Sequence, residues 1–385
     1  MITPPAQDYR LLHAAAYMAL FCVGLYAAAF GPALPFIAGD LGVSLDTAGL
    51  ILTALFLGSV SASATVAMAL HGRDTRTLCI AGLACATVGL VLIAFAPSWP
   101  VALAGGVVLG TGDGLMVAAT HMLMPLTSAD APSAINRLNL YFAIGAICGP
   151  IWAGAILAST GDRSIVYAGI ACVTLATLVL TFVADAAVHH PIAAPDEDFR
   201  LPGNPTAWIM GGVLFLYVGA EFGLGSWVSS YARETAGASV FAGALLTAAY
   251  WAALALGRVI SGIYFSRQRD ASALLMAAAA GGGLAALVLS LSSGNIIIAG
   301  AAAFGAGLCL GPIWPATVAI AAEGATGNAT AATVTMGNAG GLAIPWLQGK
   351  VLVGAGPGQG VAVTAALCAL MFGVVAAFRA RRQRL

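Results

Sequence analysis

Three ionisable residues interrupt long apolar stretches of the sequence. Glu221 lies within YVGAEFGLGSW (217–227), and Asp113 and His121 lie in GTGDGLMVAATH (110–121). Insertion of such a group at the centre of a bilayer costs about 2.5–3.5 kcal/mol, so these residues usually face a cavity or a partner and mark a pathway. Carboxylic acids and histidine can also take up and release protons. We therefore regard all three as candidate proton-coupling residues.

Glu221 and Asp113 each have a structural alternative. Glu221 could be a neutral, hydrogen-bonded acid that only holds its helix against a neighbour. Asp113 could form a structural ion pair with Arg137 or another basic group near the inner face. His121 follows Asp113 by two helical turns plus about 80° of rotation at 100° per residue. The two residues could therefore line one cavity, as a proton relay, without touching each other.

The composition of the chain requires an apolar solvent around it. Of 385 residues, 60% are hydrophobic and 8% are charged, and the mean hydropathy is +0.95, whereas soluble domains carry roughly 25% charged residues. The net charge is zero and the interior of the chain has no basic run, which argues against a nucleic-acid partner. The seven cysteines are scattered without a CxxC pair, so we expect no disulfide framework, metal or cofactor.

The sequence predicts an all-α integral membrane protein with twelve transmembrane helices. A span needs about 20 mostly apolar residues, and such windows lie at 13–38, 47–70, 77–96, 100–124, 138–159, 164–184, 207–230, 240–264, 272–291, 295–321, 330–352 and 359–378. The one long polar connection, 185–207, follows the sixth window. We therefore predict an N-terminal six-helix bundle (1–190), a cytoplasmic linker (191–206) and a C-terminal six-helix bundle (207–385).

Basic residues orient this array. With the N-terminus inside, twelve of the fifteen lysines and arginines fall on the cytoplasmic side, and only Arg163, Arg233 and Lys350 fall outside. This asymmetry follows the positive-inside rule. We expect a multi-pass protein of the cytoplasmic membrane, in contact with its lipid, with both termini in the cytoplasm.

The two halves repeat each other at a shift of 195 residues. Gly24 meets Gly219, LGTGDGL (109–115) meets FGAGLCL (304–310), and GAICGP (145–150) meets GGLAIP (340–345). The same shift places Glu221 opposite Tyr26. Small residues allow helices to pack closely, and proline lets a span kink. We assign gating or structural roles to Arg73, Arg76, Gly145, Gly149, Pro150, Arg258 and Pro345.

Two six-helix repeats joined by a long linker are typical of secondary transporters of the major facilitator type. The chain resembles the major facilitator superfamily, and HGRDTR (71–76) retains part of its loop signature after the second span. A narrower resemblance, to the fucose–galactose–glucose:proton symporter family, rests on INRLNLYFAIGAICGP (135–150), YVGAEFGLGSWVSSYA (217–232), AAYWAALALGRVISG (248–262), GLCLGPIWPATVAIAAE (307–323) and GGLAIPWLQG (340–349). The chain departs from that family in having no acid in the first span, and His121 stands where its members have asparagine.

The resemblance implies that spans one, four, seven and ten line a central cavity. Candidate substrate contacts are then Tyr26, Asn139, Glu221, Tyr250, Trp251, Trp314 and Asn338. It further implies a monomeric transporter that works by alternating access, driven by protons that act at Glu221, with Asp113 as the second candidate. The leading substrate is a small polar solute such as a monosaccharide, and the alternative is efflux of a small organic or lipophilic compound.

Two other classes of membrane protein are disfavoured. Intramembrane aspartyl proteases carry a Gly-x-Gly-Asp stretch, which GTGD (110–113) matches, but acid–base catalysis needs a second membrane carboxylate, and the remaining aspartates near the spans fall at span ends. Glu221 could take that place in principle, but the twelve-span repeat argues against a protease. A receptor would need an output domain, and the tails 1–12 and 379–385 are short. We therefore do not expect an enzyme.

Overall fold

The computed structural model describes residues 9–69, 74–184, 205–267, 270–323 and 327–383. The regular structure within these residues is helical. Its helices are α1 (Arg10–Leu41), α2 (Leu45–Ala48), α3 (Leu50–Ala69), α4 (Thr75–Ala94), α5 (Trp99–Thr127), α6 (Ala131–Thr160), α7 (Arg163–Val183), α8 (Pro205–Ala236), α9 (Val240–Ser266), α10 (Ala271–Leu291), α11 (Ile296–Leu310), α12 (Ile313–Ala322), α13 (Gly327–Ala355) and α14 (Pro357–Arg382).

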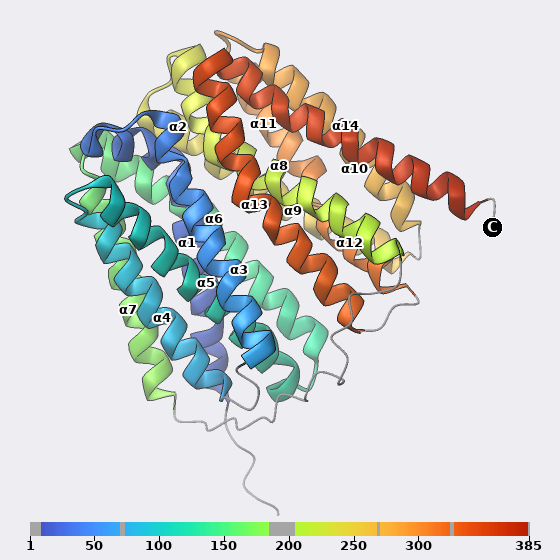
Figure 1. Ribbon diagram of the computed structural model, residues 1–385, viewed down its shortest axis with the longest axis horizontal. Coiled ribbons are helices and arrows are strands. Elements are labelled where there is room, and N and C mark those ends of the chain that lie inside the picture. The colour runs from blue at the N-terminus through green and yellow to red at the C-terminus, as the bar shows by residue number, and fades with distance from the viewer. Residues whose placement is uncertain (1–8, 70–73, 185–204, 268–269, 324–326, 384–385) are drawn as a thin grey trace, which may run out of the picture.

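These helices occupy twelve spanning positions (Figure 1). Helices α2 and α3 make one span that is interrupted at Gly49, and α11 and α12 make another that is interrupted at Gly311 and Pro312. In the described residues, eleven spans are long and apolar enough to cross a membrane. The twelfth, α13, has 29 residues, which extend about 43 Å at 1.5 Å per residue. The predicted all-α fold with twelve membrane spans is confirmed.

Polar residues at the span ends define where several helices begin. Asp74, Asp130, Asp162, Asp270 and Asn295 each accept hydrogen bonds from backbone N–H groups in the first turn of the helix that follows. Those groups have no partner inside the helix, so a short polar side chain stabilises the start.

Helix α8 begins at Pro205, a residue type that suits the first helical turn. The last two residues of the predicted linker 191–206 therefore belong to a helix, and 191–204 lie outside the described residues.

Glycines hold the first helix of each half against the fifth span of the same half. Gly145 of α6 packs against the Phe21 carbonyl of α1, and Gly340 of α13 packs against the Phe215 carbonyl of α8, so closely that a Cβ atom would overlap either oxygen. Gly149 packs in the same way against the Leu25 carbonyl. The predicted repeat of 195 residues is thus present in the packing, where glycine permits close backbone approach.

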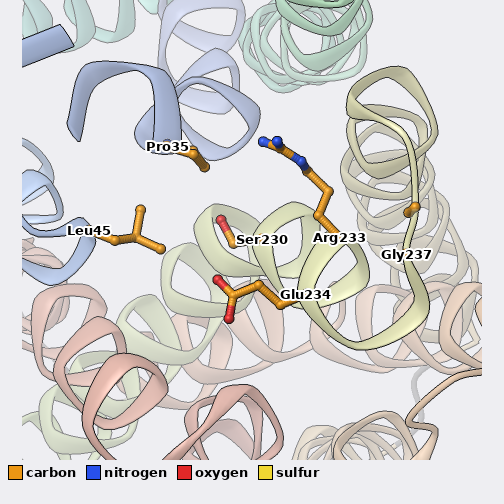
Figure 2. Close-up of a pocket in the computed structure, with 7 residues that line it drawn as sticks. Pro35, Leu45, Ser230, Arg233, Glu234 and Gly237 are labelled. Carbon is orange, nitrogen blue, oxygen red and sulfur yellow. The ribbon is translucent and has the colours of Figure 1, made fainter. Parts of the chain in front are cut away.

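The two six-helix bundles meet at one end of the molecule and diverge toward the other (Figure 1). We call the end where α1 begins and α14 ends the termini face, and the other end the opposite face. Contacts between the bundles lie from mid-depth to the opposite face: Thr53 donates a 2.7 Å hydrogen bond to the Leu342 carbonyl, Phe56 packs edge-on against Phe222 with ring centroids 4.9 Å apart, and Lys350 pairs with Asp46 at 2.7 Å. A pocket lies among α1, α2 and α8 at this face (Figure 2).

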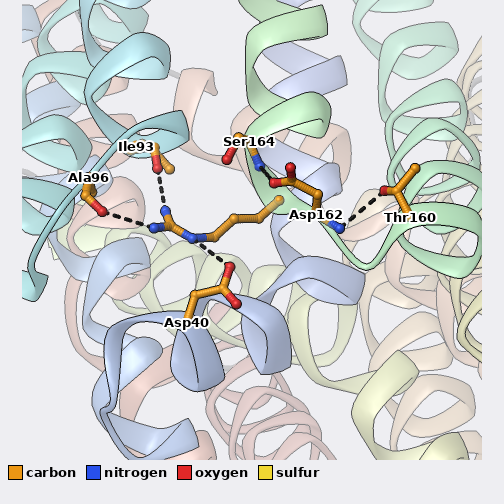
Figure 3. A network of polar contacts seen from close by, with 7 residues as sticks. Asp40, Ile93, Ala96, Thr160, Asp162 and Ser164 are labelled. Atoms are coloured by element: carbon orange, nitrogen blue, oxygen red, sulfur yellow. Dashed lines mark hydrogen bonds and ion pairs between the residues drawn. The ribbon is translucent and has the colours of Figure 1, made fainter.

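A buried arginine fixes the opposite face of the N-terminal bundle (Figure 3). Arg163, the first residue of α7, pairs with Asp40 of α1 at 2.9 Å and donates to the carbonyls of Ile93 and Ala96 at the end of α4. Because these carbonyls have no partner within α4, one side chain joins three helix ends.

Candidate functional site

Glu221 is buried in an ion pair near the middle of α8. Its side chain is 3% exposed, and its Oε1 accepts a 2.7 Å hydrogen bond from Nη2 of Arg258 on α9. Arg258 is 27% exposed, so its guanidinium lies between the buried acid and a less enclosed region. A buried ion pair needs both partners, because either charge alone would remain poorly solvated.

Tyr217 borders this ion pair, and Tyr250 and Trp314 contact its neighbours. The Tyr217 hydroxyl lies 3.4 Å from Nη2 of Arg258, and the Tyr250 hydroxyl donates to the backbone carbonyl of Glu221 at 2.9 Å. The Trp314 ring on α12 lies 6.2 Å from the Tyr217 ring. Together these residues connect α8, α9 and α12 at one depth of the C-terminal bundle. The resulting site has a charge-neutral pair beside aromatic faces.

Asp113 is held by two hydroxyl groups in the N-terminal bundle. Tyr26 of α1 donates to its Oδ1 at 2.7 Å, and Ser59 of α3 donates to its Oδ2 at 2.6 Å. Both carboxylate oxygens of Asp113, which belongs to α5, thus accept a hydrogen bond. Within the described residues Asp113 forms no ion pair with Arg137, so that predicted alternative is wrong. Tyr26 and Glu221 are equivalent in the repeat. Each bundle therefore has one acid cluster at this repeat position: Asp113 with Tyr26 in the N-terminal bundle, and Glu221 with Arg258 in the C-terminal bundle.

His121 binds its own helix. Its Nδ1 lies 2.9 Å from the Val117 carbonyl, one turn earlier in α5. Among the described residues no hydrogen bond joins His121 to Asp113, in agreement with the angular offset expected from their spacing. A direct relay between the two is not formed in this state.

The chain matches the family model of the Major Facilitator Superfamily over residues 16–345. It belongs to that superfamily. This membership makes the protein a transporter and not an enzyme. Within the described residues, no group of three histidine, cysteine, aspartate or glutamate side chains could hold a metal ion.

Solved structures of other transporters share the fold. The chain is similar to the fucose:proton symporter FucP of E. coli, with a TM-score of 0.64 and 17% identity. The similarity covers 96% of this chain and 98% of FucP. FucP in an outward conformation gives a TM-score of 0.67 at 16% identity, covering 96% of this chain and 99% of that one. A POT family transporter in complex with 5-aminolevulinic acid gives a TM-score of 0.77 at 13% identity, covering 97% of this chain and 98% of that one.

A curated relative matches part of the sequence. Bypass of stop codon protein 6 of Saccharomyces cerevisiae is 28% identical over 165 residues, which are 40% of this chain and 33% of that protein. The match thus spans about a third of the relative's length.

The predicted substrate contacts of this superfamily member differ in accessibility. Tyr26, Tyr250 and Trp251 are buried, Trp314 and Asn338 are half-buried, and Asn139 is exposed. Trp251 packs edge-on against Phe222, with ring centroids 5.5 Å apart, behind the contact between the bundles. Tyr250 and Trp251 therefore serve packing in this state, and a contact with solute stays a prediction for these six residues and for Glu221.

Several of the residues assigned to structural or gating roles contact helix backbones or ends. Arg76 donates from Nε to the Thr181 carbonyl at 3.1 Å and from Nη2 to the Phe182 carbonyl at 2.6 Å, joining α4 to the end of α7. The Pro345 carbonyl accepts a 2.7 Å hydrogen bond from the Trp227 indole. Pro150 lies inside α6. Arg73 lies outside the described residues.

Sequence reasoning did not identify Ser59 and Tyr217. Tyr217 precedes Glu221 by four residues, a spacing that places two side chains on the same helix face, so a search one turn from each acid would have found it. Ser59 lies in a serine-rich run, GSVSASAT (58–65), and the sequence does not distinguish it from its neighbours.

Proposed function

We propose that this protein moves a small polar solute across the cytoplasmic membrane by alternating access, coupled to protons. The observation that carries this proposal is one hydrogen-bonded acid cluster per bundle, around Asp113 and Glu221, in a chain whose bundles contact each other from mid-depth to the opposite face. The positive-inside asymmetry assigns the termini face to the cytoplasm. This state is then closed toward the outside, and the same fold occurs in FucP in an outward conformation. We further propose that the protein acts as a monomer.

Asp113 has the geometry of a proton switch. An ionised carboxylate only accepts hydrogen bonds, whereas a protonated one also donates. Both oxygens accept from hydroxyls, and a proton makes one of them a donor as well, which favours a turn of the Tyr26 or Ser59 hydroxyl. These hydroxyls belong to α1 and α3, so a proton on α5 alters contacts among three helices.

Glu221 has a different electrostatic setting. Its partner Arg258 keeps a permanent charge, and a proton on Glu221 would leave that guanidinium without its counter-ion. We propose that solute and proton act on this pair together: solute hydroxyls replace the contact to Arg258 while Glu221 takes up the proton. Tyr217 provides aromatic surface next to the pair, and Trp314 lies beside Tyr217. Asn139 and Asn338 remain candidate polar contacts.

The solute class follows from this polar and aromatic setting. The similar structures include a fucose:proton symporter and a transporter in complex with 5-aminolevulinic acid, and both of these compounds are small and polar. A monosaccharide is our leading candidate, because aromatic faces with a few directed hydrogen-bonding groups suit a sugar ring.

Efflux of a small organic or lipophilic compound is the second candidate. The observation that favours it is the apolar character of α1, whose buried side chains are almost all alanine, leucine or other hydrocarbons apart from Tyr26. A hexose needs several hydrogen-bond partners, and α1 offers few.

The test uses purified protein in sealed liposomes that contain a pH-sensitive dye. Hexoses, 6-deoxyhexoses, nucleosides and lipophilic cations are added in turn, and protein-free liposomes serve as the control. We expect at least one polar solute to drive proton movement that Asp113→Asn or Glu221→Gln abolishes. Proton movement with the lipophilic cations alone would favour efflux. Transport of a polar solute at a rate that does not depend on the pH gradient would refute proton coupling.

A further inference from the structure

A pocket of about 330 Å³ lies at the opposite face, away from both acid clusters (Figure 2). Its volume is within the range of small-molecule sites, about 300–1,000 Å³. Pro35 and Leu45 line it from the N-terminal bundle, whereas Ser230, Arg233 and Glu234 line it from α8 of the C-terminal bundle. The site is therefore composed of both bundles and exists only while they are together at this face.

Two polar groups of this pocket lack protein partners. Ser230 is 2% exposed, and its hydroxyl has no hydrogen-bond partner among the described residues. The same holds for the buried Nη1 of Arg233, whose guanidinium stacks over the Phe36 ring, 5.5 Å from its centroid. Buried polar groups are normally hydrogen-bonded, so an unmet donor beside a cavity indicates a missing partner.

The pocket also carries a negative charge. The Glu234 carboxylate lines it, and among the described residues Arg233 and Glu234 form no ion pair, although they are adjacent in the chain. In Figure 2 the Ser230 hydroxyl and the Glu234 carboxylate lie on one side, and the guanidinium of Arg233 extends away from Glu234. Separated opposite charges on one wall suit a ligand that carries both charges.

We propose that this pocket binds a small zwitterion with an apolar side chain, such as an amino acid. Its carboxylate accepts from Arg233, its ammonium donates to Glu234 and to the neighbouring Ser230 hydroxyl, and its side chain packs against Leu45 and Pro35. A simple anion would meet the repulsion of Glu234, and a simple amine that of Arg233, which makes both weaker ligands.

Occupancy of the pocket biases the conformation of the transporter. Because both bundles form its walls, a bound ligand stabilises the state closed at this face relative to the state open there. This effect on conformation rests on the proposed alternating access, whereas the binding of the zwitterion does not depend on that proposal. The zwitterion is thus a regulator or an early docking stage at the face that we assign to the outside.

The test is calorimetric binding to the purified full-length protein in detergent. Leucine and 6-aminohexanoate are the zwitterions, and 4-methylpentanoate and 3-methylbutylamine are leucine without its amino or its carboxylate group. We expect saturable binding of a zwitterion, at least about tenfold tighter than either single-charge analogue, as expected for loss of one charge-assisted hydrogen bond.

Variants place that binding in the pocket. Arg233→Gln, Glu234→Gln and the conservative Ser230→Ala each weaken it, whereas Arg382→Gln and Glu323→Gln, which change an exposed ion pair at the termini face, do not. Gly31→Leu, which blocks close approach of the bundles, abolishes it. No saturable binding of either zwitterion, equal binding of 4-methylpentanoate, or pocket variants that bind like the controls would overturn the proposal. Unchanged affinity in Gly31→Leu would overturn the two-bundle site.

Discussion

At the scale of single residues, Glu221 and Arg258 depend on each other. The acid is almost fully buried, and the arginine provides its only ion pair among the described residues. Removing one partner of a buried pair typically costs about 3–5 kcal/mol, while replacing both by apolar side chains is often neutral. The pair can therefore be tested through stability as well as through transport.

We predict that Arg258→Leu lowers the stability of the protein by about 3–5 kcal/mol, measured as thermal unfolding in detergent. The double variant Glu221→Leu with Arg258→Leu regains most of that loss, because no charge is then left unpaired. Arg382→Leu is the matched control. It breaks an exposed pair with Glu323, and such pairs contribute about 0–1 kcal/mol. Equal melting temperatures for Arg258→Leu and Arg382→Leu would contradict the buried-pair account.

Asp113 allows a test of coupling. Asparagine keeps the size of the side chain and can still accept from one hydroxyl, but it cannot exchange a proton. We predict that Asp113→Asn retains solute exchange between two equal pools and loses proton-driven accumulation by at least about tenfold, or 1.4 kcal/mol. Ser59→Ala removes one hydrogen bond but leaves the acid and its contact with the Tyr26 hydroxyl, so proton-driven accumulation should persist. Wild-type accumulation in Asp113→Asn would exclude Asp113 as a coupling residue.

The acids could be predicted from the sequence, but not all of their partners. A charged residue in an apolar run is conspicuous, so Asp113 and Glu221 stand out. Arg258 is also conspicuous, yet its pairing with Glu221 depends on the crossing of α8 and α9, 37 positions apart in the chain. Ser59 is one serine among several, and only the packing of α3 on α5 selects it.

At the scale of helices, glycines set how closely the bundles approach each other. A Cβ atom on Gly31 of α1 would lie 2.9 Å from the Gly225 carbonyl oxygen of α8 and 3.3 Å from that of Ser226. These neighbours are backbone atoms, which cannot rotate away. Gly39, on the same helix, has nothing within 4 Å of that position.

We predict that Gly31→Leu holds the bundles apart at the opposite face, whereas Gly39→Leu has no such effect. The measurement is the rate at which a membrane-impermeant maleimide labels Ser230→Cys in a background without other cysteines. Ser230 is 2% exposed in the closed state, so labelling should be faster with Gly31→Leu and unchanged with Gly39→Leu. Slow labelling in both variants would show that Gly31 does not control closure.

The number of spans could be predicted, but their interruptions could not. The apolar windows give twelve spans because a bilayer requires about 20 apolar residues in each. The window 295–321 is continuous in hydropathy, yet the helix breaks at Gly311 and Pro312 beside Trp314. Pro312 and Pro315 lack backbone N–H donors, which weakens the helix there, but local sequence does not decide whether a helix kinks or breaks.

At the scale of the whole molecule, the central claim is that the two bundles expose the acid clusters to each side of the membrane in turn. Helices α6 and α9 belong to different bundles, and Gly154 and Ala244 contact each other near the opposite face. Each helix offers exposed positions at both ends: Arg137 and Thr160 on α6, Ser266 on α9 and Ser239 at its start. Distances between labels on these two helices can therefore be measured at both faces.

The most direct measurement is pulsed electron spin resonance on two doubly labelled proteins, each free of native cysteines, in liposomes at high and low pH with and without solute. One carries labels at Arg137 and Ser266, and the other at Thr160 and Ser239. We predict opposite changes: under conditions that shorten the Arg137–Ser266 distance, the Thr160–Ser239 distance lengthens. Distances that stay fixed, or that change in the same direction at both faces while transport proceeds, would contradict alternating access.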